Sequence, residues 1–290
     1  MKPKGVDNQD ELSEDNWIVK SLNIHGTFFE RLCASIVRQA PHWTLTTTNY
    51  PVEVNGNHSE LDIRADAELD ESLKLRLLIE CKKNNPDFIK WVFFRKPDAS
   101  SELIVPGSDL KGVKLLRSPP LFPFGSVIAN DAREVRGCYQ AYKSNDKTKT
   151  SNAAITDASK QISLATEQIW AEEWNSAKQV LAKSLFPPGF PRTFIFPVIV
   201  TTAQLHACDF DPADIDLTTG EIPYEKVKLS KALHTVVYEY ALPRDIHQQP
   251  VLPLDDRLVR RHIVVVHSTF LAEFMQTLLV HMQQVAPAGK

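Results

Sequence analysis

Three residues, Asp62, Glu80 and Lys82, have the types and the spacing that suit phosphodiester hydrolysis. A hard divalent cation such as Mg²⁺ prefers oxygen ligands, commonly taking one or two carboxylates and keeping waters and phosphate oxygens as the rest. Asp62 and Glu80 offer those carboxylates. A lysine beside them can orient or deprotonate the attacking water and offset the negative charge of the transition state. The set therefore predicts a metal-dependent nuclease that uses Mg²⁺ or Mn²⁺.

Two strands with alternating polar and apolar residues are expected to position this set, because alternate side chains of a strand share a face. On the first strand we expect a polar face formed by Glu60, Asp62, Arg64 and Asp66. The opposite, apolar face is formed by Leu61, Ile63 and Ala65. The run from Leu75 to Lys82 likewise places Glu80 and Lys82 opposite Leu77, Ile79 and Cys81. Adjacent antiparallel strands would bring Asp62, Glu80 and Lys82 together, and a bend would place the backbone carbonyl of Cys81 at the metal.

Other periodic segments predict the elements around these strands. Before them we expect a helix from Asn23 to Gln39 that carries Glu30, a β-rich segment from Trp43 to Val54, and a hairpin turn at Asn55-Gly56-Asn57. After them the pattern predicts a long helix from Ala154 to Ser184 and a strand buried on both sides from Phe194 to Thr202. A strand from Leu205 to Phe210 is expected to return along it, and a terminal helix is expected from Thr269 to Gln283.

The combination of Asp62 with the tripeptide Glu80-Cys81-Lys82 resembles the PD-(D/E)xK, or restriction-endonuclease-like, nucleases, including the Mrr-like restriction enzymes and archaeal Holliday-junction resolvases. The resemblance implies an α/β (α+β) fold, with a central mixed sheet flanked by helices. It implies Glu30 as an auxiliary carboxylate and assigns Lys160 and Gln161 to the helix after the motif strand. It also implies DNA as the substrate, a homodimer, and a role in restriction or defence beside a partner protein.

Two features depart from the family pattern. Leu61 stands where the family name has proline, which is a common variation, and a long segment separates Lys82 from the next helix. We therefore expect a flexible tail over residues 1–16 and a nuclease domain over 17–290, whose core spans 20–83 and 152–290 and whose insertion, or inserted lobe, spans about 84–150. Within the insertion, Lys143 to Lys149 is expected to form a mobile loop.

Positive charge is concentrated directly after the proposed site. The whole chain has a net charge of −3, yet residues 82–149 hold 13 Lys and Arg against 7 Asp and Glu. Such a segment can track a phosphate backbone, although a solvated loop surface has the same composition. The residues we assign to nucleic-acid binding are Lys83, Lys90, Arg95, Lys96 and Lys160. The interleaved aromatics Phe88, Trp91, Phe93 and Phe94 would either stack bases or form a small core.

Several other classes of protein are disfavoured. The sequence has no apolar run that could span a bilayer and no hydrophobic signal region, so we expect a cytoplasmic protein without membrane contact. Its four cysteines are scattered, and it contains neither a Gly-rich phosphate loop nor a serine nucleophile elbow. Three alternatives stay open. The acidic residues line a solvated sheet face, or the fold is a non-catalytic nucleic-acid-binding or interaction module. In the third, the motif is accidental and the chain is an enzyme or scaffold of an unrelated α/β type, in which Asp62 and Glu80 would lie too far apart to share a cation.

Overall fold

The computed structural model describes twelve stretches of the chain, which are residues 14–24, 26–70, 73–84, 90–95, 102–104, 107–108, 121–123, 134–143, 148–151, 153–183, 192–243 and 260–285. Within these stretches, no helix combines the length and the apolar character that crossing a membrane would require.

Two helices, rather than the single one expected from Asn23 to Gln39, open the described chain. Helix α1 spans Glu14–Ile24 and α2 spans Thr27–Gln39. They are separated because Gly26 adopts a left-handed conformation with φ of 82°, which a continuing α-helix cannot accommodate. The α1 helix also begins inside the segment that we expected to be a tail.

Three antiparallel strands follow, as the sequence predicted. Strand β1 (Thr44–Val54) is joined to β2 (Asn57–Asp70) by a tight turn in which Asn55 and Gly56 both have positive φ. Two consecutive positive φ values suit the twist of a two-residue hairpin, which explains the Asn-Gly pair. Strand β3 (Leu73–Lys82) then pairs antiparallel with β2.

A mixed sheet forms the centre of the molecule, in the strand order β1-β2-β3-β10-β14-β13. The last three of these strands span Arg192–Thr201 (β10), Arg260–His267 (β14) and Thr235–Ala241 (β13). Strands β3, β10 and β14 run parallel to one another. The β10 sequence is buried along nearly its whole length because helices cover both faces of the sheet, as its apolar composition predicted.

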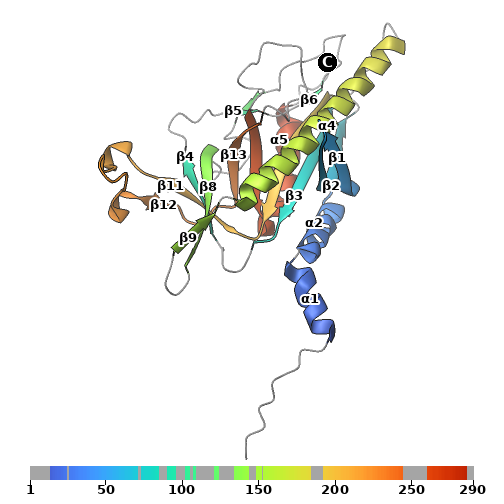
Figure 1. Ribbon diagram of the computed structural model, residues 1–290. Coiled ribbons are helices and arrows are strands. Elements are labelled where there is room, and N and C mark those ends of the chain that lie inside the picture. Colours follow the sequence, from blue (N-terminus) through green and yellow to red (C-terminus); the bar gives the residue numbers. More distant parts are fainter. Residues whose placement is uncertain are drawn as a thin grey trace, which may run out of the picture.

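Helices pack on both sides of this sheet (Figure 1). The long helix α4 (Ala153–Lys183) covers one face with apolar residues that include Ile162 and Ile169. On the other face, α2 and the terminal helix α5 (Leu271–Val285) share a second apolar cluster, and the short helix η4 (Ser268–Phe270) precedes α5. This arrangement agrees with the expected α/β architecture of a central mixed sheet flanked by helices.

The segment 84–150 contributes strands to the same sheet instead of forming only a separate lobe. Strands β4 (Lys90–Arg95) and β8 (Glu134–Lys143) pair with each other, and β8 also pairs with β13. Strand β9 (Thr148–Ser151) pairs with β8 across part of the stretch where we expected a mobile loop. The remaining short strands are β5 (Glu102–Ile104), β6 (Gly107–Ser108) and β7 (Leu121–Pro123), and β5 and β7 form a small second sheet.

Burial explains why β4 joins the sheet. Trp91 and Phe93 are fully buried in the apolar cluster beneath α4, so they form core and are not available to stack bases. Phe88 lies outside the described residues, and Phe94 is half-buried. Of the two interpretations of these aromatics, the structure favours core packing.

The strand after β10 does not return along it, so that prediction was wrong. Strand β11 (Gln204–Asp209) pairs parallel with β4 and antiparallel with β12 (Lys228–Leu229). In this pairing the buried residues Leu205 and Ala207 lie beside Trp91 and Phe93 of β4, so the apolar residues of the two strands are buried together. Two short helices, η2 (Pro212–Asp214) and η3 (Tyr224–Lys226), lie between β11 and β12.

Candidate active site

The site lies where β2 and β3 separate, a place we call the fork. Backbone pairing between the two strands runs from Asp70 and Leu73 to Ile63 and Ile79 and goes no further. Beyond that point β2 continues along β1 as far as Asn57, whereas β3 continues along β10 as far as Lys82. The fork therefore opens between residues 57–62 of one strand and 80–82 of the other.

Asp62 closes the apex of the fork. Its Oδ2 accepts a hydrogen bond of 2.6 Å from the backbone N–H of Cys81, taking the place of a ladder bond between the strands. In an antiparallel strand the N–H and C=O of one residue point toward the same neighbour, so the Cys81 carbonyl also points into the fork. The Cys81 side chain turns the other way and joins the apolar cluster with Cys33 of α2.

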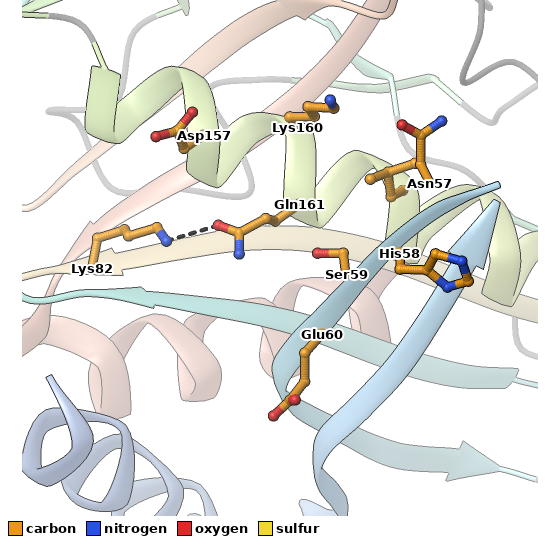
Figure 2. Close-up of a pocket in the computed structure, with 9 residues that line it drawn as sticks. Asn57, His58, Ser59, Glu60, Lys82, Asp157, Lys160 and Gln161 are labelled. Carbon is orange, nitrogen blue, oxygen red and sulfur yellow. Dashed lines mark hydrogen bonds between the residues drawn. The ribbon is translucent and has the colours of Figure 1, made fainter. Parts of the chain in front are cut away.

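The strand also twists strongly at Asp62. Leu61 packs in the apolar cluster under α4, whereas Ile63 packs in the cluster on the α2 and α5 side. Residues two apart share a face in a flat strand, so our expectation of one continuous apolar face from Leu61 to Ala65 was wrong. Glu60 consequently points away from α4, as Figure 2 shows.

Glu80, Lys82 and Gln161 form a connected set. The Lys82 ammonium lies 2.9 Å from Glu80 Oε1 and donates a 2.8 Å hydrogen bond to Gln161 Oε1. Gln161 projects from α4 toward the end of β3 (Figure 2). Glu80 is 2% exposed, and no described residue hydrogen-bonds its Oε2. The structure thus brings Gln161, assigned by resemblance, to the lysine of the tripeptide.

Glu30 approaches the same charges from α2, on the opposite side from Gln161. Its carboxylate lies close to Gly26, where an added Cβ would be 3.7 Å from Glu30 Oε1 and 3.7 Å from Lys83 Cβ. The α1–α2 junction therefore lies beside the end of β3. Lys83 reinforces this contact by donating a hydrogen bond to the carbonyl oxygen of Asn23, the residue before the end of α1.

The fork holds more buried carboxylates than cations, and burial together with this excess of negative charge raises their pKa values. Burial raises the pKa of Glu80 to about 8, the charge of Asp62 adds to the rise, and Lys82 opposes it. Burial also raises the pKa of Asp62 to about 6, against the effect of the Cys81 N–H, while Glu30 adds to the rise. The pKa of Glu30 is raised by burial and by the charge of Glu60. Lys82 therefore opposes the charge of three carboxylates, those of Asp62, Glu80 and Glu30.

These residues fit a divalent cation held partly by water. Among the described residues, no three His, Cys, Asp or Glu side chains converge closely enough to hold a metal ion between them. The donors at the fork are instead two carboxylates, Asp62 and Glu80, together with the inward-pointing carbonyl of Cys81. Mg²⁺ is commonly bound by one or two carboxylates while it keeps several waters. The buried Glu80 Oε2, which lacks a hydrogen-bond partner, is the kind of oxygen that a cation would satisfy.

Of the described residues assigned to nucleic-acid binding, Lys160 lies at a cavity beside the fork and the others lie elsewhere on the surface or have undescribed side chains. Lys160 lines a cavity beside the fork, together with Lys82 and Gln161. Lys83 is exposed and engaged with Asn23, and Lys90 is exposed at the start of β4. Arg95 ends β4, but its side chain and the whole of Lys96 lie outside the described residues.

Sequence reasoning missed the tip of the β1–β2 hairpin. His58 and Ser59 line the same cavity as Lys160, as does Asp157 one turn earlier on α4. The alternation of β2 gave no reason to single them out, because a hairpin tip with polar residues is ordinary. Their position depends on the separation of β2 from β3, which no local pattern reveals.

The comparisons with known proteins assign no family. No protein-family model matches the chain, and no curated protein or solved structure is significantly similar to it. The geometry and charges of the fork are therefore the features from which a function can be inferred.

Proposed function

We propose that this chain is a divalent-metal-dependent nuclease of the restriction-endonuclease-like, PD-(D/E)xK type, which hydrolyses phosphodiester bonds in DNA. One observation carries the proposal: Asp62 and Glu80 are desolvated side by side at the fork, where Lys82 is the cation that contacts Glu80. Burying carboxylates with insufficient positive charge is costly, so a site that merely stabilised the fold would be expected to balance them.

Asp62, Glu80 and the Cys81 carbonyl would hold the cation. When bound, a divalent cation lowers the pKa of a coordinated water, polarises the phosphoryl oxygen and stabilises charge on the leaving oxygen. Positive charge added at the fork would return Glu80 to its ionised form, because the charge on Glu80 would then have a partner.

Lys82 would act on the attacking water and the phosphate. Its ammonium is held from two sides, by Glu80 Oε1 and by Gln161 Oε1, so its direction is fixed before substrate binds. A preorganised cation of this kind stabilises negative charge that develops in the transition state without reorganising at that moment. Gln161 is thus a positioning residue, and Glu30 supplies a further carboxylate from α2.

The deciding experiment is a cleavage assay on plasmid, linear double-stranded and single-stranded DNA with Mg²⁺, Mn²⁺ or EDTA. Wild type should cut only with a divalent cation, and Asp62→Ala and Lys82→Ala should both be inactive while remaining folded by circular dichroism. If none of the three proteins cuts any substrate but all retain DNA equally, the chain is the non-catalytic binding module instead. Gel-filtration mass would test the homodimer that the resemblance implies.

A further inference from the structure

A cavity of about 500 Å³ lies next to the fork, between the tip of the β1–β2 hairpin and the first half of α4 (Figure 2). Ser59 points from β2 into the space beneath α4, and Lys160, Gln161 and Leu164 line the cavity from the helix. We call this cavity the hairpin groove. The residues proposed for cleavage include two of its lining residues, Lys82 and Gln161.

The shared lysine makes the hairpin groove continuous with the reactive centre. The Lys82 ammonium contacts Glu80 on the side of the fork and Gln161 on the side of the groove. A phosphodiester placed against Lys82 would therefore have its neighbouring nucleotide in the groove. This continuity connects the groove to the polymer substrate rather than to an unrelated small molecule.

The lining suits one nucleotide. Lys160 and Lys82 supply cations beside the carboxylates of Asp157 and Glu60, and Ser59 and the amide of Gln161 supply donors for phosphate and sugar oxygens. Leu164, which is 2% exposed, gives the groove an apolar floor, and His58 supplies a ring at the hairpin tip. Planar rings and apolar surface beside a cation are the features that bind unpaired bases without sequence preference.

The groove is also held at a fixed width. Near the hairpin tip, the backbone N–H of Glu53 donates a 2.6 Å hydrogen bond to Gln168 Oε1 of α4. Tyr50 O–H donates to Glu172 Oε1 of the same helix at 2.7 Å. These ties join the hairpin to α4 just beyond the groove, so the groove cannot widen without breaking them. A space of about 500 Å³ between two tied walls has room for a single nucleotide.

We propose that the hairpin groove seats one unpaired nucleotide of the cleaved strand, so that the substrate class is single-stranded or locally unpaired DNA. This inference rests on the proposed nuclease function for its connection to cleavage, but the binding that it requires can be measured without cleavage.

The test uses the full-length protein and a fluorescein-labelled 20-nucleotide strand of mixed sequence, either alone or annealed to its complement. Fluorescence anisotropy in EDTA measures binding, and cleavage is then followed with Mg²⁺. The variants are Lys160→Ala, which removes the cation, and Ser59→Trp, which fills the groove. Lys183→Ala is the matched control, because Lys183 is an exposed lysine in the last turn of the same helix.

Wild type should bind the single strand about tenfold more tightly than the duplex. Lys160→Ala and Ser59→Trp should each weaken single-strand binding about five- to tenfold and move the ratio toward one, whereas Lys183→Ala should keep it. A charge effect outside the groove would weaken both DNA forms equally in Lys160→Ala and in Lys183→Ala, and would overturn the inference. So would equal or tighter binding of the duplex by wild type.

The two proposals fail separately. If groove-dependent binding of the single strand is seen but no protein cuts DNA with Mg²⁺ or Mn²⁺, the nuclease proposal is wrong and the nucleotide site stands. If duplex is cut at least as fast as the single strand and both groove variants cut like wild type, the fork is a nuclease site and the groove is not its nucleotide subsite.

Discussion

Strands β2 and β3 carry two charged clusters toward α4, and only one of them is balanced. At the fork, Asp62 and Glu80 are accompanied by Lys82. Four residues further along β2 and four residues earlier on β3, Asp66 meets Arg76 in two hydrogen bonds of 2.7 and 3.0 Å. We call this second group the Arg76 cluster.

The Arg76 cluster pairs two cations with two anions. Lys74 lies 3.0 Å from Asp66, and Arg76 also donates to Glu173 of α4. The hydrogen bonds and charge of Arg76 hold the pKa of Asp66 below its usual value despite the burial that opposes this shift. At the fork the same kind of burial is not offset, and the pKa values of Asp62 and Glu80 rise.

The charges of the Arg76 cluster neutralise one another and stabilise the fold, whereas the carboxylates at the fork keep an excess of negative charge that a bound cation could neutralise. Both clusters lie on the same two strands and are buried, so burial alone does not explain the difference. It comes from the ratio of cations to anions and from the separation of the strands beyond Ile63 and Ile79. Removing charge from the fork should therefore affect catalysis, whereas removing charge from the Arg76 cluster should affect stability.

The largest expected effect is on catalysis. Asp62→Asn keeps an oxygen that can accept the Cys81 N–H but removes the charge, and it should lower cleavage at least about 10³-fold. Asp66→Asn, four residues along the same strand, is the matched control and should retain most activity at temperatures where it is folded. The measurement is initial cleavage rate with saturating Mg²⁺. Comparable rates for Asp62→Asn and wild type would remove Asp62 from the site.

The Arg76 cluster should show the largest effect on stability. Arg76→Met leaves Asp66 and Glu173 without their shared cation, so the free energy of unfolding should fall by about 3 kcal/mol. Urea denaturation followed by circular dichroism measures it. Adding Glu173→Leu to Arg76→Met should recover part of the loss, because it removes one of the stranded charges. A loss below about 1 kcal/mol would mean that this cluster is solvated and contributes little.

In the absence of divalent cations, the free energy of unfolding should depend on pH. Because the pKa of Glu80 is about 8 in the folded state and 4.5 is its ordinary value, the folded protein binds an extra proton between these values. The free energy of unfolding should therefore fall as pH rises from 5.5 to 7.5, by about 2–3 kcal/mol, and the raised pKa of Asp62, about 6, adds a smaller fall in the same direction. The pKa of Asp66 is lowered, so the stability it contributes is fully present above pH 3.8 and does not change in this window.

Urea denaturation in EDTA at the two pH values, on wild type and Glu80→Gln, tests this sign. The variant should lose most of the slope and be more stable than wild type at pH 7.5. Mg²⁺ should stabilise wild type more at pH 7.5 than at pH 5.5, because its ligands must be ionised. A stability that rises toward pH 7.5 in EDTA would contradict the excess of negative charge at the fork.

The sequence predicted most of the elements but not how they are joined. Alternation and turn chemistry placed β1, β2 and β3 and the turn at Asn55-Gly56, because these depend on local backbone preferences. The break at Gly26 was missed because one glycine in a helical pattern does not by itself end a helix. The partner of β11 was missed because strand pairing depends on contacts far apart in sequence.

For the candidate site, the residue types could be read from the sequence, but the burial and the surroundings of these residues could not. Asp62, Glu80 and Lys82 were selected from spacing, and Gln161 came from resemblance; the structure brings all four together. The sequence could not show that Glu80 is almost fully buried or that β2 twists at Asp62, since both depend on α4 and on the separation of two strands. Balanced and unbalanced clusters look alike as strings of acidic and basic residues.

The smallest expected effect comes from Gln161, which acts on the reaction through Lys82. Gln161→Leu removes the 2.8 Å hydrogen bond but leaves the 2.9 Å contact between Lys82 and Glu80, so the ammonium loses one of its two fixed directions. We expect cleavage to fall about tenfold, mainly in kcat, and Gln161→Glu to restore part of it by supplying an acceptor. Single-turnover rates and melting temperatures together separate this from a folding defect. A purely structural glutamine would lower the melting temperature of both variants and leave the rate of the folded protein unchanged, whereas a positioning residue lowers kcat in fully folded protein and Gln161→Glu recovers part of it.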